Sequence, residues 1–248
     1  MLNRNTKNRS DLLYIGLGRI AKLYGFYIVI MTLFRFFFVF YFDDQSVLAN
    51  NTLDVVKAYY YGWLYDTMVL SYILLPVFIF LILSTIFRSV FLLNTLQVLM
   101  KVIFILCGIF IPFILISDYG FYSYFQDHLN ILFFGLLEDD TSALIETIQK
   151  NYPIEVALVA FGIYIIGLWF LARRIFVKLL KNKSRYPSSI IKPALSIIGV
   201  FILFIGGIRG GYGKFVLAPK YADFSNNEFI NQIPINGCLL YTSPSPRD

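Results

Sequence analysis

The sequence predicts an all-α membrane protein with five transmembrane helices. Of the 248 residues, 58% are hydrophobic and only 15% are charged, and the mean hydropathy is +0.70. A soluble domain is about 45–50% apolar and about 25% charged, so this composition leaves too little polar surface to cover a soluble globule. The apolar residues also form blocks long enough to cross about 30 Å of hydrocarbon as a helix. These observations exclude a single soluble enzyme domain.

Five apolar blocks are the predicted spans, and each contains few charges. The first lacks the small-residue cleavage site of a signal peptide, so we expect it to be retained. The third is short, but the residues just before it are also apolar, so its helix is expected to start earlier and to carry Lys101. The predicted spans are residues 23–42, 67–87, 102–117, 154–171 and 193–208.

The charges of the polar segments predict the orientation. The segments before the first span, between the second and third, and between the fourth and fifth are rich in Lys and Arg, and Asp11 is their only acid. The opposite segments hold most of the other acids. Because Lys and Arg favour the cytoplasmic side, we expect the N-terminus in the cytoplasm and everything after Ile208 outside. The net charge of +6 therefore reflects membrane topology and does not predict a nucleic-acid partner.

The longest external segment, residues 118–153, is predicted to contain two interfacial amphipathic helices. Its first part has aromatic residues within 121–125, then apolar residues at 129, 132 and 133, a pattern typical of a helix lying along the headgroups. Its second part begins with Asp139 and Asp140, an acidic helix start, before a one-sided apolar run. Pro153 then ends this helix and begins the fourth span.

The last residues, 238–248, differ abruptly from the rest of the chain. They read Cys-Leu-Leu-Tyr-Thr-Ser-Pro-Ser-Pro-Arg-Asp. This string resembles, codon by codon, the conceptual translation of a transposase-type sequencing adapter, and the alternative is a disordered Ser/Pro tail. We therefore expect the natural chain to continue past about Asn236, and we assign no function to residues 238–248.

Three external segments share their patterns with one family. Residues 61–66 read Tyr-Gly-Trp-Leu-Tyr-Asp, and residues 118–122 read Asp-Tyr-Gly-Phe-Tyr. Residues 209–215 read Arg-Gly-Gly-Tyr-Gly-Lys-Phe, followed by Phe-Ser-Asn-Asn-Glu-Phe-Ile-Asn-Gln at 224–232 and by Asn236. These segments resemble the entry to the second span, the segment after the third span and the segment after the fifth span of lipoteichoic acid synthase-like proteins. The last match is the most specific.

The resemblance implies five spans, an outside C-terminus and a following extracytoplasmic domain of the sulfatase superfamily. In that family the domain uses a hydroxyl nucleophile and a divalent metal, Mn, Mg or Zn. It transfers phosphoglycerol or phosphoethanolamine from an anionic phospholipid donor in the modification of cell-envelope polymers or lipids, and related members are sulfatase-like hydrolases. The resemblance thus implies a parent enzyme in the bacterial cytoplasmic membrane, with the bilayer, the phospholipid donor and its own catalytic domain as partners.

The chain itself is expected to lack the catalytic site. Fewer than about thirty native residues follow Ile208, which is below the roughly 40 at which small domains need additional support to fold. We therefore expect a transmembrane domain over residues 1–208, an external linker over 209–237 and the adapter-like tail over 238–248. No catalytic, cofactor-binding or metal-binding residue is predicted in these segments.

Arg35 lies inside the first predicted span among phenylalanines. A charge there costs about 2.5–3.5 kcal/mol on insertion scales, so it needs a partner or water. Asp66, just before the second span, could supply that partner. One interpretation is that Arg35 and Asp66 contact a lipid phosphate near the outer leaflet. The alternative is a structural ion pair, or snorkelling of the arginine to the interface.

Arg209, Gly210 and Gly211 are the other candidate headgroup contacts. Glycine leaves backbone N–H groups accessible to an anion, and arginine binds phosphate in a bidentate manner. The spacing lacks the P-loop lysine, so the signal is not a nucleotide-binding motif. The alternative is a flexible exit from the membrane that carries an interfacial arginine.

His128 and the acidic run Glu138, Asp139 and Asp140 are the remaining candidates for metal chemistry. His128 is the only histidine, so no multi-histidine site can form within the chain. We expect His128 at the membrane interface near Asp127. The acidic run could bind a hard cation, but an acidic helix start that complements the helix dipole explains it better.

The alternative function class is a non-enzymatic five-span carrier or sensor that binds a solute or a protein partner. A transporter should contain paired Gly or Pro interruptions that face one another. Here Pro76 and Pro112 are isolated, and glycine concentrates at residues 206–213, around the end of the last span. The sequence therefore favours the membrane-anchor interpretation.

Overall fold

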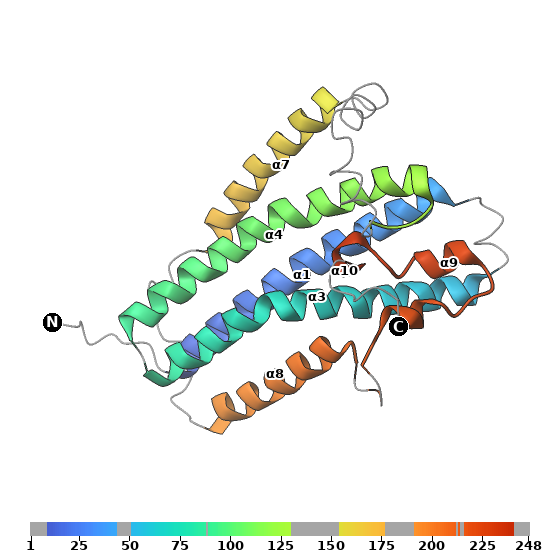
Figure 1. The fold of residues 1–248 in the computed structure, drawn as a ribbon. Coiled ribbons are helices and arrows are strands. Elements are labelled where there is room, and N and C mark those ends of the chain that lie inside the picture. The colour runs from blue at the N-terminus through green and yellow to red at the C-terminus, as the bar shows by residue number, and fades with distance from the viewer. Residues whose placement is uncertain are drawn as a thin grey trace, which may run out of the picture.

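The computed structural model describes residues 9–43, 51–87, 89–129, 154–176, 191–211, 213 and 216–240, and every regular element in these ranges is helical (Figure 1). This confirms the all-α expectation for the described residues. Three short helices follow the long ones, and α10 includes the first residues of the adapter-like tail. The long helices are α1 (Arg9–Phe42), α3 (Thr52–Phe87), α4 (Val90–Phe125), α7 (Ile154–Ile175) and α8 (Ile191–Arg209); the short ones are η1 (Pro219–Ala222), α9 (Glu228–Gln232) and α10 (Gly237–Leu240).

Helices α1, α3 and α4 are long and apolar enough to cross a membrane. They contain 34, 36 and 36 residues, which corresponds to about 51–54 Å at 1.5 Å per residue. The first three predicted spans lie inside them, but each helix begins well before its span. The reason is that hydropathy marks the apolar stretch, whereas polar helix formers such as Lys22, Lys57 and Lys101 let the helix continue past it. The early start of the third helix is confirmed.

The described part of the predicted interfacial segment does not form a separate helix. Residues 118–125 continue α4 without a break, and the helix ends at Phe125. Gln126 adopts a left-handed conformation with a φ of 52°, and its N–H donates to the carbonyl of Tyr122. The chain therefore turns back sharply at Gln126. The second predicted interfacial helix, with Glu138, Asp139 and Asp140, lies outside the described residues.

Helices α1, α3 and α4 each contact the other two, and one further long helix lies on either side of this group. Helices α1, α3 and α4 run antiparallel to their chain neighbours, α7 packs against α4, and α8 packs against α3 and α1 (Figure 1). Within the core, the rings of Phe78 and Phe204 stack with centroids 4.7 Å apart, joining α3 to α8. The Tyr27 hydroxyl donates to the carbonyl of Phe104 and joins α1 to α4.

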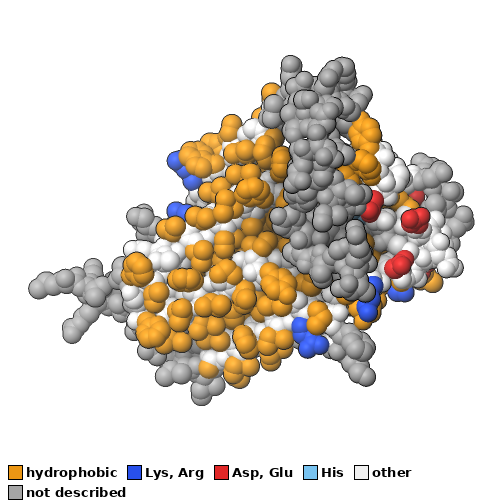
Figure 2. Space-filling view, in the orientation of Figure 1, with side chains coloured by type: hydrophobic (Ala, Val, Ile, Leu, Met, Phe, Trp, Pro, Cys, Tyr) orange, Lys and Arg blue, Asp and Glu red, His pale blue; other side chains and the backbone are white. Residues whose placement is uncertain are grey.

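Many large hydrophobic side chains lie on the outer faces of the helices. On the face drawn in Figure 2, hydrophobic side chains cover much of the described helical surface, and acidic side chains lie toward one end. Large side chains such as Phe37 and Phe40 are 55% and 79% exposed. A soluble monomer rarely exposes a contiguous apolar surface of this extent. The surface therefore agrees with the composition in indicating a membrane protein.

The contact between α8 and α3 depends on a small residue, which gives a test of the packing. A Cβ atom at Gly207 would lie 2.2 Å from Ser71 Oγ, whereas one at Gly199 would meet no atom within 4 Å. We expect Gly207→Leu to push the two helices apart and to lower the free energy of unfolding by about 1–3 kcal/mol or more. Unfolding in detergent micelles measures this effect. The same change at Gly199 is the control, and equal losses in both variants would contradict the packing.

Candidate functional site

Buried charged and polar side chains gather at one end of the group formed by α1, α3 and α4. They come from α1, α3, the end of α4, the turn that follows α4, and the C-terminal segment, which we define as residues 216–237. Four of them line a small cavity of about 20 Å³. We name the set the polar core; its members are Arg35, Asp66, Asp118, His128 and Asn236, none more than 7% exposed.

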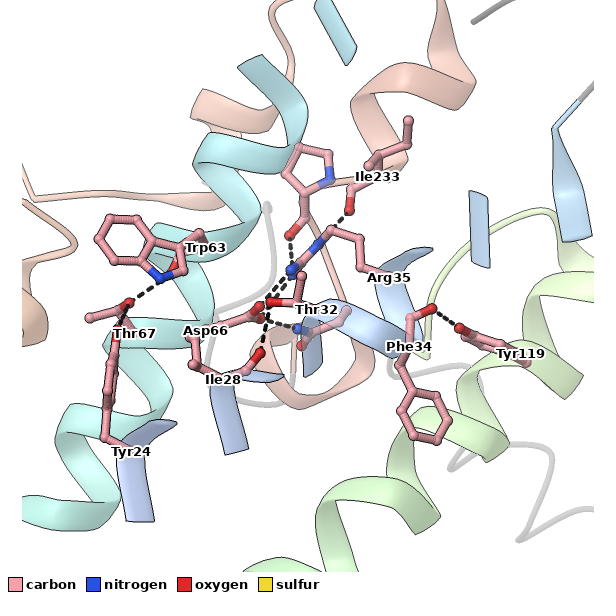
Figure 3. A network of polar contacts seen from close by, with 12 residues as sticks. Tyr24, Ile28, Thr32, Phe34, Arg35, Trp63, Asp66, Thr67, Tyr119 and Ile233 are labelled. Carbon is pink, nitrogen blue, oxygen red and sulfur yellow. Dashed lines mark hydrogen bonds and ion pairs between the residues drawn. The ribbon is translucent and has the colours of Figure 1, made fainter. Parts of the chain in front are cut away.

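Arg35 and Asp66 form a bidentate ion pair between α1 and α3 (Figure 3). Arg35 Nη1 lies 2.5 Å from Asp66 Oδ2, and Nη2 lies 2.8 Å from Oδ1. The two side chains are 4% and 0% exposed. Arg35, which lies in an apolar block, thus has a buried counter-ion. The geometry supports the interpretation of the two residues as a structural ion pair.

The remaining donors of Arg35 hold the C-terminal segment. Arg35 Nε donates to the carbonyl of Ile233 at 3.1 Å, and Nη2 donates to the carbonyl of Pro234 at 3.3 Å. Asn236 Nδ2 in turn donates to Asp66 Oδ1 at 2.8 Å. The ion pair therefore joins α1, α3 and the C-terminal segment in one network, and a lipid phosphate would have to displace these contacts.

Gly62 explains the glycine–aromatic–aspartate pattern of residues 61–66. A Cβ atom at Gly62 would lie 2.4 Å from Arg35 Nε. Because residues four apart lie on the same helix face, Gly62 provides the space for the guanidinium and Asp66 provides its acceptor. Gly62 and Asp66 thus form the α3 side of the ion-pair site, which receives Arg35 of α1.

Asp118 and His128 form the second contact to the C-terminal segment. His128 Nδ1 lies 2.7 Å from Asp118 Oδ2, and His128 Nε2 lies 2.9 Å from the carbonyl oxygen of Gln232. Asp118 Oδ1 accepts the N–H of Leu129 at 2.8 Å, and the imidazole stacks on Phe38 at 5.2 Å.

The structure confirms that His128 lies near Asp127, since the His128 backbone N–H donates to Asp127 Oδ1 at 2.8 Å; its level relative to the membrane interface stays a prediction. The ring itself is 2% exposed and pairs with Asp118. Sequence reasoning missed this pair because the left-handed Gln126, which turns the chain back toward α4, carries no glycine signal. The acid ten residues earlier was the available clue.

Asparagines fold the C-terminal segment locally. The Asn227 side chain caps α9 by accepting the N–H of Ile230 at 3.3 Å. Asn231 Oδ1 accepts the N–H groups of Phe224 and Ser225 at 3.2 and 2.8 Å, and its Nδ2 donates to Asp223 Oδ1 and to the Ser225 carbonyl. The asparagines of the most specific family-like segment therefore have a structural role.

The folded segment also binds the first turns of α3. Ser225 Oγ donates to Asp54 Oδ2 at 2.8 Å, and Lys57 Nζ lies 4.5 Å from the centre of the Phe224 ring. Closer to the ion pair, the Tyr65 hydroxyl donates to the carbonyl of Ala218 at 2.8 Å. The segment is thus attached along a surface that runs from α3 to the polar core.

The four hydrogen bonds of Asn231 give a prediction for this attachment. We expect Asn231→Ala to increase hydrogen exchange at the amides of Phe224 and Ser225 by about tenfold or more, because each lost bond contributes roughly 1 kcal/mol. Hydrogen exchange measured by mass spectrometry tests this. Asn226→Ala changes an exposed asparagine of the same segment and should leave the exchange unchanged; similar exchange in both variants would contradict the role of Asn231.

Arg209, Gly210 and Gly211 lie at the C-terminal end of α8. Gly210 has a φ of 70°. Its N–H donates to the carbonyl of Gly207 at 3.0 Å, and the N–H of Gly211 donates to the carbonyl of Gly206 at 2.7 Å. This is a Schellman cap, so the two amides bind the helix end and do not point outward. Arg209 is exposed, with Nη2 3.4 Å from the Gly213 carbonyl, and its charge complements the helix dipole. Headgroup binding by these residues stays a prediction.

Metal ligands do not cluster in the part of the chain that the structure describes. No group of three or more His, Cys, Asp or Glu side chains in those residues is placed to hold a metal ion. The acids of the polar core instead pair with Arg35 and His128. The arrangement is suited to holding a segment in place.

Comparisons with known proteins gave no relative. No protein-family model, no curated protein and no solved structure matches the chain. A functional assignment therefore has to rest on the residues and their arrangement.

Proposed function

We propose that this chain is the membrane domain of an extracytoplasmic, sulfatase-fold phosphotransferase of the lipoteichoic acid synthase-like type. Support comes from one observation above all: the segments that resemble the family meet in the polar core. Asp66 belongs to the first segment, Asp118 to the second, and Asn236 with the carbonyl of Gln232 to the third. The first and third segments are joined by a direct hydrogen bond, and the second is joined to the third through His128.

In the proposed topology, all five long helices cross the bacterial cytoplasmic membrane and the polar core faces outward. Helices α7 and α8 contain 22 and 19 residues, or about 33 and 28 Å, enough for the remaining two spans. Arg173 and Arg174 in the last turn of α7 mark its cytoplasmic end. The exposed Arg209 then lies at the outer headgroup level, beside Gly210 and Gly211.

The proposed role of the chain is to anchor and position a catalytic domain. The polar core fixes the C-terminal segment to the helices, so a domain that continues from this segment is held close to the anionic phospholipid donor. The nucleophile and the divalent metal, Mn, Mg or Zn, belong to that domain. Pro76 and Pro112 lie within continuous helices, so neither proline breaks α3 or α4 in the way expected for the discontinuous spans of a carrier.

The decisive experiment is to recover and express the intact gene. We expect the reading frame past Asn236 to encode a hydroxyl nucleophile beside acidic and histidine metal ligands. The intact protein, in vesicles of phosphatidylglycerol with Mn²⁺, should release diacylglycerol. A stop codon soon after Asn236, or a domain without such ligands, would overturn the proposal.

The orientation is tested separately by labelling with a membrane-impermeant maleimide. In a Cys107→Ser/Cys238→Ser background, Asn226→Cys should react in intact cells. The matched control, Lys183→Cys in the basic segment between the fourth and fifth predicted spans, should react only after lysis. The reverse pattern would overturn the proposed topology.

A further inference from the structure

The two ring nitrogens of His128 both face oxygen atoms. Nδ1 lies 2.7 Å from Asp118 Oδ2 and Nε2 lies 2.9 Å from the carbonyl oxygen of Gln232. A neutral imidazole has one N–H donor and one acceptor nitrogen, whereas a carbonyl oxygen and a carboxylate oxygen only accept. A carboxylate paired with a neutral imidazole has one N–H donor for these two contacts. Both contacts are hydrogen bonds only when the Asp118–His128 pair carries one additional proton.

The location of that proton follows from the other contact of Asp118. Asp118 Oδ1 accepts the N–H of Leu129 at 2.8 Å, and a hydrogen bond to a carboxylate favours its charged form. Imidazole is also the stronger base of the two groups. The geometry therefore places the proton on His128, as an imidazolium that donates from both nitrogens.

The charges around His128 agree with an imidazolium. On α4 and the following turn, Asp118 pairs with the ring and Asp127 accepts the backbone N–H of His128. The ring centroid of Tyr122 lies 5.4 Å from that of His128. Arg35 of α1 lines the same small cavity but is already neutralised by Asp66. Glu228 of α9 adds a further negative charge near Tyr122. A neutral ring would leave the buried Asp118 without a counter-ion, which is costly.

We propose that His128 is a pH-dependent latch for the C-terminal segment. The protonated ring holds the carbonyl of Gln232, and the carbonyls of Ile233 and Pro234, next along the chain, are held by Arg35. Loss of the proton removes one of the two N–H donors, so the ring can no longer donate to both oxygens. The Gln232 carbonyl is then released and the segment loosens from the polar core.

The direction of the pH dependence follows from the charges. A histidine that gains a carboxylate partner on folding stabilises the bound state at pH values at which the ring is protonated. This stabilisation is lost as the pH rises and the ring loses its proton. The latch therefore opens as the pH rises. The latch rests on the geometry alone, and the orientation proposed above decides only which compartment sets its pH.

The charge state of His128 can be observed directly, because it is the only histidine in the chain. The full chain, carrying a histidine-free tag and ¹⁵N-labelled histidine, is studied by NMR in detergent micelles. At pH 7 we expect both ring nitrogens to be protonated. Asp118→Asn removes the counter-ion and should give a neutral ring at the same pH. A wild-type ring with one protonated nitrogen at pH 7 would overturn the proposal without any variant.

Release of the segment is measured by hydrogen exchange of residues 228–236, corrected for the intrinsic pH dependence of exchange. Protection should fall about 10- to 100-fold as the pH rises through the titration seen by NMR, as expected for loss of a charged hydrogen bond. A peptide from the middle of α3 should keep its protection. His128→Gln, which cannot titrate, should show no such step. A pH-independent wild type, or a step that persists in His128→Gln, would overturn the latch.

Discussion

Replacing Asp66 by alanine is expected to destabilise the protein by about 3–5 kcal/mol, the cost of leaving a buried charge without its partner. Asp66 is fully buried and accepts from both terminal nitrogens of Arg35 and from Asn236. Its loss leaves the Arg35 guanidinium in a dry environment and removes the acceptor of Asn236. Denaturant unfolding in detergent micelles measures the free-energy change, and hydrogen exchange of residues 228–236 measures the detachment of the C-terminal segment.

The matched control for Asp66→Ala replaces both ions by apolar residues of similar size. The double variant Arg35→Met/Asp66→Leu should recover most of the lost stability, because a buried ion pair and its apolar replacement are often of similar stability. Exchange of residues 228–236 should stay fast in it, because the carbonyls of Ile233 and Pro234 lose their donor. A loss below about 1 kcal/mol for Asp66→Ala is the value expected for a solvated surface pair and would contradict the buried ion pair.

The second large effect is expected at Gly62. A methyl group at this position would lie 2.4 Å from Arg35 Nε and 2.5 Å from Cζ. The guanidinium cannot give way without breaking its contacts to Asp66 and to the C-terminal segment. Gly62→Ala should therefore cost about 2–4 kcal/mol, by overpacking and by disruption of the ion pair. The same unfolding measurement tests it.

Gly120 provides the control for Gly62, since it lies in α4 and a Cβ atom there meets no atom within 4 Å. Alanine is the better helix former, so Gly120→Ala should be neutral or stabilising by up to about 1 kcal/mol. In the Asp66→Ala background, Gly62→Ala should add little, because the contact that it disrupts is already lost. Full additivity of the two changes would show that Gly62 does not act through Arg35.

The sequence predicts helices better than it predicts their ends. Apolar blocks identify α1, α3 and α4, yet α3 begins at Thr52 because residues before the apolar block are also compatible with a helix. The cap at Gly210 and Gly211 could have been predicted, since glycine directly after an apolar run and a basic residue is typical of a helix C-terminus.

The polar core shows what sequence reasoning can and cannot reach. The pairing of Arg35 with Asp66 could be anticipated, because a charge in an apolar block requires an opposite charge nearby. The contacts of both residues with Ile233, Pro234 and Asn236 could not, because they join positions about 170–200 residues apart and no local pattern encodes such a distance. The role of His128 was hidden for the same reason at its contact with Gln232.

The lengths of α1, α3 and α4 set the height of the polar core. Helices of 34 to 36 residues, tilted by as much as about 40°, would still reach across about 39–41 Å, whereas the hydrocarbon is about 30 Å thick. In the topology proposed above, at least roughly 10 Å of each helix would therefore extend beyond the lipid tails. The polar core lies near one end of these helices, so the C-terminal segment bound there would be held at a fixed height above the bilayer surface.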